Sequence, residues 1–230
     1  MIICILGPHS DDESPTMIWN LPNTLTWLRI FAIPLVVVFF YLPFNWADPA
    51  AGLLFAVAGI TDSLDGYFAR KYHQTSRLGA FLDPVADKLI VAVALVLLVS
   101  KEMPPIIVPG IEGLDGGHAT LRPESVRAIL VLCSIVIIGR EIAISALREW
   151  MAEIGQRGKV KVSNLAKLKT IVQIVGLSCM LFRWNLVILP GVSLPVFEIG
   201  LVLTVVAAVL TLISAVSYLR AAWPDLRGQT

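Results

Sequence analysis

The sequence predicts an all-α integral membrane protein with six transmembrane helices, and both its composition and its pattern of apolar runs support this fold class. Of the 230 residues, 57% are hydrophobic and 15% are charged, whereas about a quarter of the residues of a soluble domain are charged. The mean hydropathy is +0.79. The apolar residues form long runs between short segments rich in proline, glycine and charge. A run of about 20 apolar residues is long enough for a helix to cross a bilayer.

Six such runs follow one another along the chain. They lie near residues 23–42, 49–71, 81–100, 125–149, 166–185 and 196–219. Between them, pairs such as Pro104-Pro105 and Pro190-Gly191 mark linkers, because proline and glycine interrupt helices. The linker at 101–124 is predicted to be a polar loop, and its glycines do not form the GxxxxGK[ST] pattern of a phosphate-binding loop.

The region before the first run is predicted to contain two different segments. Residues 1–17 are expected to be a flexible extension, and the transmembrane domain is expected to cover residues 18–225. Residues 18–29 mix tryptophan and leucine with asparagine and threonine, so we expect an interfacial segment that lies on the cytoplasmic surface of the membrane. Pro22 is expected to start the helix that follows.

Lysine and arginine predict how the chain is oriented in the membrane. One alternating set of linkers, together with the C-terminus, carries eleven of these residues, and the other set carries four. Because cytoplasmic segments are enriched in positive charge, we expect a multi-pass protein of the inner (cytoplasmic) membrane with both termini in the cytoplasm. The loop cluster of Arg157, Lys159 and Lys161 is expected to bind anionic lipid.

The residues predicted to bind a metal ion are aspartates, since the histidines and cysteines are isolated from one another and do not have the spacing of a zinc site. Asp62 and Asp65 fall in the second predicted span, and Asp83 and Asp87 fall in the third. Each pair lies on one helical face. Charged groups inside spans are rare and usually face a cavity or a partner. Mg²⁺ or Mn²⁺ would compensate four carboxylates, although ion pairs with neighbouring basic residues are the structural alternative.

The same aspartates belong to a longer pattern. Residues 62–70 read DSLDGYFAR, and after eight residues 79–87 read GAFLDPVAD. This arrangement resembles the signature of the CDP-alcohol phosphatidyltransferases, DxxDGxxAR, eight residues and GxxxDxxxD. Residues 23–26 with Arg29 resemble the N-terminal segment of that family. The stretches at 139–141, 146–150 and 167–170 resemble its bacterial branch that makes phosphatidylglycerophosphate.

The resemblance implies a reaction and a cofactor. The reaction is transfer of the phosphatidyl group from CDP-diacylglycerol to sn-glycerol 3-phosphate, which gives phosphatidylglycerophosphate and CMP. An active site that opens to the cytoplasm, two bound Mg²⁺ or Mn²⁺ ions and a homodimer are expected. The four aspartates would hold the metal, and Asp87 would also be the general base for the acceptor hydroxyl.

Further residues are expected to bind the two substrates. Those expected to contact CDP-diacylglycerol are Asn23, Arg29, Gly66, Ala69, Arg70, Ser76 and Gly79. For Arg29, snorkelling to lipid headgroups is an equal alternative. A phosphorylated acceptor requires cations, and the candidates on the fourth and fifth spans are Arg140, Arg148, Lys167 and Lys169. Arg140 could instead form a salt bridge to Glu141 or to an aspartate of the spans.

Other functions stay open at this point. Within the same family, the acceptor could be inositol phosphate, serine or phosphatidylglycerol. Four aspartates in adjacent spans could also build a divalent-cation transporter, although the carboxylates belong to one half of the chain and no inverted repeat is visible. The intact signature disfavours a purely structural role. No nucleic-acid partner is expected.

Overall fold

The structure is a computed structural model that describes residues 21–72, 77–112, 118–156, 164–189 and 192–227. Within these ranges, side chains are described for all residues except 21–25, 62–72, 77–81, 83, 107–112, 118–119, 164–167, 187–189, 192 and 226. The predicted extension at 1–17 and the basic cluster of Arg157, Lys159 and Lys161 lie outside the described residues.

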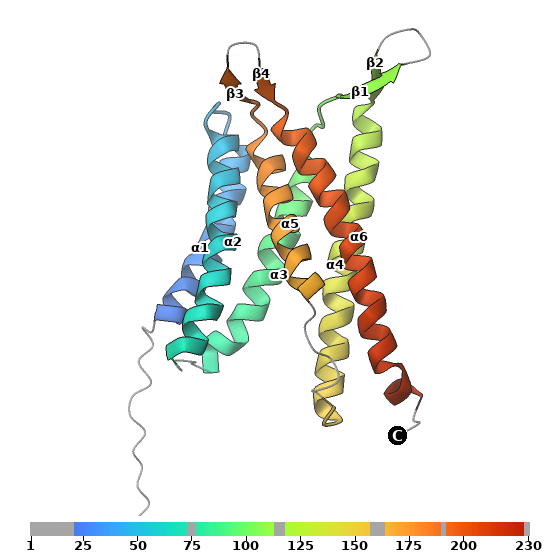
Figure 1. Ribbon diagram of the computed structural model, residues 1–230. Helices are drawn as coiled ribbons and strands as arrows, with labels where there is room; N and C mark the ends of the chain where they lie inside the picture. The colour runs from blue at the N-terminus through green and yellow to red at the C-terminus, as the bar shows by residue number, and fades with distance from the viewer. Residues whose placement is uncertain (1–20, 73–76, 113–117, 157–163, 190–191, 228–230) are drawn as a thin grey trace, which may run out of the picture.

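Six long helices form the body of the described chain and run alternately in opposite directions (Figure 1). They are α1 (Leu21–Tyr41), α2 (Ala47–Tyr72), α3 (Arg77–Ser100), α4 (Pro123–Glu153), α5 (Asn164–Phe182) and α6 (Val196–Leu226). Two antiparallel hairpins pair β1 (Ile106–Glu112) with β2 (His118–Leu121) and β3 (Leu186–Leu189) with β4 (Val192–Leu194). Both hairpins lie at one end of the bundle, which we call the hairpin end. The opposite end, where α1, α3 and α5 begin, is called the site end.

Helix length and composition fit a membrane protein. Two helical stretches, Pro123–Glu153 and Val196–Asp225, are long and apolar enough to cross a membrane. Shorter apolar stretches at Thr26–Tyr41, Ala47–Thr61 and Leu168–Phe182 accompany them in α1, α2 and α5. At ~1.5 Å per residue, the 19 residues of α5 extend over about 28 Å, close to the ~30 Å of a bilayer core. The prediction of a mainly helical protein with membrane-crossing helices is confirmed at this level.

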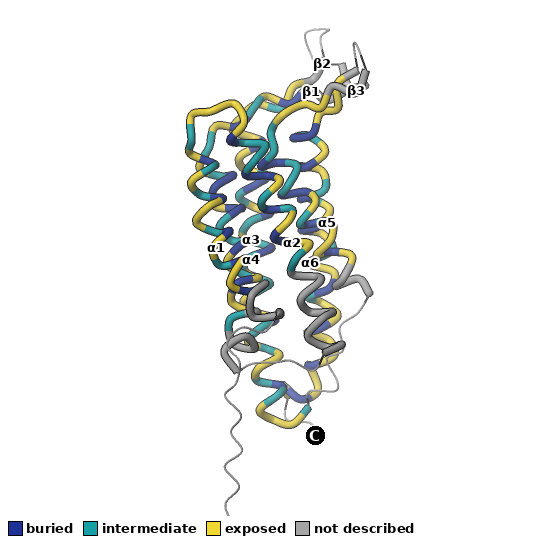
Figure 2. The backbone as a smooth tube through the Cα atoms, turned by 90° about the vertical axis from the view of Figure 1, so that its left-hand side faces the viewer, coloured by how far each residue is buried: buried dark blue, intermediate teal, exposed yellow. Residues whose placement is uncertain are grey.

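The bundle exposes apolar side chains and buries polar ones. Phe31, Leu132 and Val202 are 66%, 63% and 62% exposed, whereas Arg29 and Lys169 are 1% and 4% exposed. Figure 2 shows that exposed and buried positions alternate along each helix, with the buried positions facing the interior of the bundle. Because proteins in water keep arginine and lysine at the surface, this distribution fits a bundle that lipid surrounds.

Glycines let three of the helices approach closely. A Cβ atom on Gly52 of α2 would lie 2.7 Å from the Phe182 backbone nitrogen of α5. A Cβ atom on Gly200 of α6 would lie 2.8 Å from the Gly176 carbonyl oxygen of α5. Such close backbone contacts require residues without a side chain, as at many helix interfaces in membranes. Helix α5 is therefore held tightly between α2 and α6.

One prediction about the connections is wrong. The segment 101–124 is not a simple polar loop, because Ile106–Glu112 and His118–Leu121 in it form the β1–β2 hairpin. The linker predicted between the fifth and sixth helices is present, and β3 and β4 pair within it. The β-branched runs that flank the breakers, such as Ile106 to Val108, are the physical reason, since such residues favour strands. The described part of the segment predicted at 18–29 is continuous with α1, which runs without a break from Leu21, and its interfacial position stays a prediction.

Candidate active site

A central cavity lies among the helices toward the site end. Its volume is about 140 Å³. The polar part of its lining includes Arg29 of α1, Asp87 and Lys88 of α3, Glu141 of α4 and Gln173 of α5. Helix α2 supplies apolar and small residues to the remaining wall. Polar side chains that are far apart in the sequence therefore converge on one cavity, whose remaining lining is apolar.

Arg29 holds Asp87 across the interface between α1 and α3. The Arg29 NH1 group donates to Asp87 Oδ1 at 2.6 Å. The Arg29 side chain is fully buried, whereas the Asp87 side chain is 46% exposed. The guanidinium thus points into the bundle, and the snorkelling alternative for Arg29 is wrong. The pair orients a carboxylate that remains accessible to a ligand.

A second cavity, which we call the α3–α4 cavity, lies on the other side of Asp87. Its volume is about 310 Å³. The polar residues that line it are Asp87, Lys88, Arg140, Glu141, Ser145 and Arg148. Asp87, Lys88 and Glu141 line both cavities. The Lys88 ammonium donates a hydrogen bond to the Ser145 hydroxyl across α3 and α4. The two cavities therefore meet at a small set of charged side chains.

Glu141 of α4 pairs with two cations, its neighbour Arg140 and Lys169 of α5, and the second pair links the two helices. Its Oε1 atom accepts from Arg140 NH1 at 3.0 Å and from the Lys169 ammonium. The side chains of Arg140 and Lys169 are 8% and 5% exposed, and that of Glu141 is 30% exposed. Burial of two cations costs free energy unless a carboxylate compensates them. Glu141 supplies that charge.

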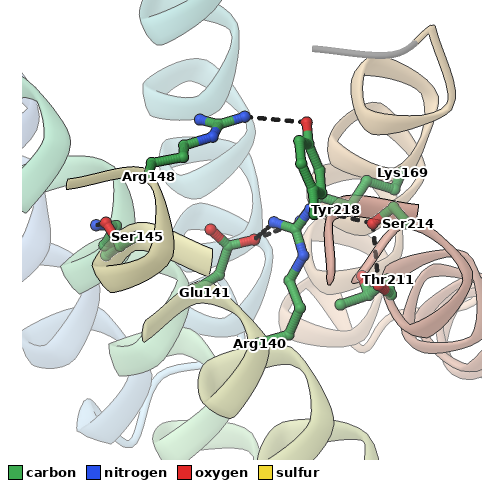
Figure 3. A network of polar contacts seen from close by, with 9 residues as sticks. Arg140, Glu141, Ser145, Arg148, Lys169, Thr211, Ser214 and Tyr218 are labelled. Atoms are coloured by element: carbon green, nitrogen blue, oxygen red, sulfur yellow. Dashed lines mark hydrogen bonds and ion pairs between the residues drawn. The ribbon is translucent and has the colours of Figure 1, made fainter. Parts of the chain in front are cut away.

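Two arginines of α4, Arg140 and Arg148, are both held by α6 (Figure 3). Arg148 NH2 donates to the Tyr218 hydroxyl at 3.0 Å, and Arg140 NH2 donates to Ser214 Oγ at 3.0 Å. The Cζ atoms of Arg140 and Arg148 lie 5.5 Å and 5.2 Å from the centre of the Tyr218 ring. Arg140 and Arg148 are eight residues apart and Ser214 and Tyr218 four, so each pair lies on one helical face. The face of α4 that carries the two arginines therefore packs against the face of α6 that carries Ser214 and Tyr218.

The charges around the two cavities favour an anionic ligand. The described cations are Arg29, Lys88, Arg140, Arg148 and Lys169, and the described carboxylates are Asp87 and Glu141. Arginine donates paired hydrogen bonds to phosphate oxygens in a fixed geometry. The α3–α4 cavity places such donors beside Asp87, a carboxylate that can accept a proton. This arrangement can bind a phosphorylated alcohol and deprotonate its hydroxyl group.

The predicted metal ligands are only partly within the described structure. The backbone assigns Asp62 and Asp65 to α2 and Asp83 to α3, but their side chains lie outside the described residues. Among the side chains that are described, no group of three or more His, Cys, Asp or Glu residues could hold a metal ion. The four-aspartate metal site therefore stays a prediction.

The other predicted site residues divide in the same way. The structure brings together Arg29, Asp87, Arg140, Arg148 and Lys169. The side chains or positions that lie outside the described residues are those of Asn23, Gly66, Ala69, Arg70, Ser76, Gly79 and Lys167. The salt bridge from Arg140 to Glu141, which was the structural alternative, is present. The substrate-binding role of Arg140 stays a prediction.

Sequence reasoning missed Lys88, Ser145, Ser214 and Tyr218 as members of the site. A signal was available for the last two, because they are polar residues four apart in a mostly apolar helix. Polar groups inside membrane helices usually face a partner. The sequence-based prediction used this rule for charged residues only, so the hydroxyl groups of Ser214 and Tyr218 did not enter it.

Comparison with known proteins decides the family. The family model for CDP-alcohol phosphatidyltransferase matches residues 19–213, which include both the aspartate signature and the cations of α4 and α5. The chain belongs to the CDP-alcohol phosphatidyltransferase family. The signature-based prediction is therefore confirmed.

Relatives of this family in enteric bacteria cover almost the whole chain. A protein of Salmonella choleraesuis (strain SC-B67) is 44% identical over 93% of this chain and 100% of its own length. Proteins of Shigella flexneri and Escherichia coli (strain K12) are each 43% identical over the same shares. All three carry the name CDP-diacylglycerol–glycerol-3-phosphate 3-phosphatidyltransferase. The phosphatidyltransferase relatives therefore match almost the whole of this chain, well beyond the signature.

Proposed function

We propose that this protein transfers the phosphatidyl group of CDP-diacylglycerol to sn-glycerol 3-phosphate and releases CMP. The observation that carries the proposal is the convergence of Arg140 and Arg148 beside Asp87 around the α3–α4 cavity, with Lys169 paired to Glu141 of the same lining. Cations suited to the acceptor phosphate thus lie next to a carboxylate suited to its hydroxyl group. The name shared by relatives that are 43–44% identical supports the same reaction.

Asp87 is the general base in this proposal. Its carboxylate takes the proton from the C1 hydroxyl of glycerol 3-phosphate as that oxygen attacks the β-phosphorus, which carries the diacylglycerol. A new phosphorus–oxygen bond forms, the bond to the CMP oxygen breaks, and CMP leaves. Arg29 orients the carboxylate through the 2.6 Å contact to Oδ1. The half-exposed Asp87 side chain leaves room for the acceptor.

The donor headgroup belongs, in this proposal, at the site end near the signature. A set made only of carboxylate oxygens suits Mg²⁺ or Mn²⁺, so Asp62, Asp65, Asp83 and Asp87 fit two such ions. When bound, these ions would neutralise negative charge on the diphosphate. Residues proposed to contact the nucleotide and diphosphate are Asn23, Arg29, Gly66, Ala69, Arg70, Ser76 and Gly79.

An apolar groove supports a lipid donor. It lies between α1 and α2, has a volume of about 230 Å³, and is lined by side chains such as Leu28, Phe31 and Val57. Arg29 and Ala58 line both this groove and the central cavity. A ligand with a polar head in the central cavity and an apolar tail in the groove would be continuous across these two residues. CDP-diacylglycerol has such a polar head and apolar tail.

The membrane setting is part of the proposal. Six spans with the site end in the cytoplasm would place the cavities where the water-soluble acceptor enters. The apolar exterior of the described helices supports membrane spans, and the excess of basic residues in the alternating linkers supports this orientation. We further propose a homodimer in the inner (cytoplasmic) membrane, with both termini in the cytoplasm and with Lys167 near the acceptor phosphate.

The test is an assay of CMP release by purified protein in detergent with CDP-diacylglycerol and Mg²⁺ or Mn²⁺. The acceptor panel contains glycerol 3-phosphate, myo-inositol 1-phosphate, L-serine and phosphatidylglycerol. We expect metal-dependent release only with glycerol 3-phosphate. Release with another acceptor alone would overturn the proposed substrate. Folded protein that releases no CMP with any acceptor, but transports divalent cations in vesicles, would overturn the reaction itself.

A further inference from the structure

We infer that Tyr218 is a positioning residue that sets the preference of this site for a phosphorylated acceptor. The inference rests on the proposed function. Tyr218 is on α6, is 4% exposed, and is not part of the aspartate signature. Both arginines of the α3–α4 cavity contact it. Arg148 donates a hydrogen bond to its hydroxyl group, and the guanidinium groups of Arg140 and Arg148 both lie over its ring.

The geometry explains how one tyrosine controls two guanidinium groups. The hydroxyl oxygen accepts from one terminal nitrogen of Arg148 at 3.0 Å, and Arg148 also lines the α3–α4 cavity. The ring lies 5.5 Å from Arg140 Cζ, within the range of an attractive cation–π contact. Arg140 is also restrained by Ser214, one turn before Tyr218. The α6 face therefore fixes both guanidinium groups before any ligand arrives.

Fixed donors bind phosphate better than mobile ones, because less side-chain entropy is lost on binding. Arginine side chains have large rotamer entropy. Arg148 is exposed, so its guanidinium group would be free to move without the contact to Tyr218. A neutral acceptor such as free glycerol would gain nothing from this arrangement. Tyr218 thus favours the phosphorylated acceptor without contacting it.

The inference predicts a specific kinetic change. In Tyr218→Phe, the hydrogen bond to Arg148 is lost and the ring remains, so the KM for glycerol 3-phosphate should rise about tenfold, as expected for one hydrogen bond to a charged group. In Tyr218→Leu, the ring contacts are lost as well, and the rise should approach 100-fold. The kcat and the KM for CDP-diacylglycerol should change less than about threefold, because the phosphate contact is equal in ground and transition states.

A matched control is available at the other end of the bundle. The hydroxyl group of Tyr41 on α1 lies 3.1 Å from Ser100 Oγ of α3, so Tyr41→Phe removes the same atom from a tyrosine hydrogen bond far from the cavities. We expect wild-type KM values for both substrates in Tyr41→Phe. If Tyr218→Leu does not fold, Tyr218→Phe and Ser214→Ala carry the test, with Ser214→Ala raising the KM for glycerol 3-phosphate about fivefold.

A double-mutant cycle separates positioning from general packing. If Tyr218 acts through Arg148, Tyr218→Phe should change the KM for glycerol 3-phosphate less than about twofold in an Arg148→Lys background, because the two changes remove one interaction. Effects that multiply fully in the double variant would overturn the inference. So would a Tyr218→Phe variant that lowers kcat at unchanged KM, or that raises the KM values of both substrates alike.

The same experiment distinguishes this inference from the proposed function. Wild-type turnover with glycerol 3-phosphate and a Tyr218→Phe variant that behaves like Tyr41→Phe would overturn the inference alone. Wild-type protein that uses only an acceptor without a phosphate group would overturn both. Turnover with glycerol 3-phosphate and a selective rise in its KM for the Tyr218 variants would support both.

Discussion

The two ends of the bundle each hold a carboxylate between two cations, but the surroundings of these clusters differ. At the hairpin end, Asp48 Oδ1 lies 2.6 Å from Lys101 Nζ, and its Oδ2 lies 4.0 Å from Arg183 Nε. At the site end, Glu141 pairs with Arg140 and Lys169. The charge pattern is the same, so charge alone does not indicate which cluster has a function.

The position of each cluster in its helices explains the difference. Asp48 is in the first turn of α2, and Lys101 and Arg183 directly follow the last residues of α3 and α5. Anions at helix N-termini and cations at helix C-termini are stabilised by the helix dipole, so the hairpin-end cluster serves the ends of three helices. Arg140 and Glu141 lie in the middle of α4, where no helix end accounts for them.

Burial separates the clusters as well. The Arg140 and Lys169 side chains are 8% and 5% exposed, against 17% for Arg183 and 33% for Lys101. Coulomb interactions are stronger where water is excluded. The cations at the site end therefore have more to gain from a bound phosphate. Mid-helix position and burial, rather than charge, distinguish a candidate site from a structural cluster.

The largest contrast is expected between the aspartates. Asp87→Asn removes the proposed general base and should lower CMP release at least ~1000-fold, within the range of positioned acid–base catalysis. Asp48→Asn makes the same chemical change at the hairpin end and should leave turnover within about twofold. The measurement is the initial rate with both substrates saturating, on variants whose melting temperature is known. An Asp87→Asn enzyme within tenfold of wild type would show that another group takes the proton.

The next contrast concerns the arginines. Arg140→Lys keeps the charge but loses the paired donors, and the KM for glycerol 3-phosphate should rise roughly 50-fold. Arg183→Lys, near the hairpin end, should leave that KM unchanged. Titration of the acceptor at saturating CDP-diacylglycerol measures both. Equal effects of the two substitutions would remove Arg140 from the acceptor site.

A feature of this molecule could be predicted from the sequence where the pattern that indicates it lies within one short stretch of the chain. The helices were predictable because a run of apolar residues is a local property, and the signature placed Asp87 because its spacing is local too. Contacts such as Arg29 with Asp87, 58 residues apart, depend on how helices pack and have no sequence pattern. The hairpins were missed because two short β-branched runs beside prolines and glycines were read as linkers. Tyr218 was missed because it carries no charge.

Stability provides a smaller contrast between the carboxylates. Glu141→Gln leaves two buried cations without a counter-charge, and the free energy of unfolding should fall by about 2 kcal/mol. Breaking a fully buried ion pair costs about 3–5 kcal/mol. The smaller loss is expected here because the Glu141 side chain is 30% exposed. Asp48→Asn should cost about 1 kcal/mol. Thermal or denaturant unfolding in one detergent, followed by tryptophan fluorescence, compares them. A larger loss for Asp48→Asn would reverse the assignment of the two clusters.

The smallest effect tests whether the hairpin-end cluster is only a stabilising one. A double-mutant cycle of Asp48→Asn and Lys101→Met should give a coupling of at most ~1 kcal/mol in unfolding free energy, since both side chains are partly exposed and solvent screens such pairs. The coupling should shrink when salt is raised to about 1 M, where the Debye length is about 3 Å. Neither variant should alter the KM for glycerol 3-phosphate. A coupling that is large and insensitive to salt would mean that water does not reach Asp48, and the hairpin end would then hold a desolvated charge cluster like that around Glu141.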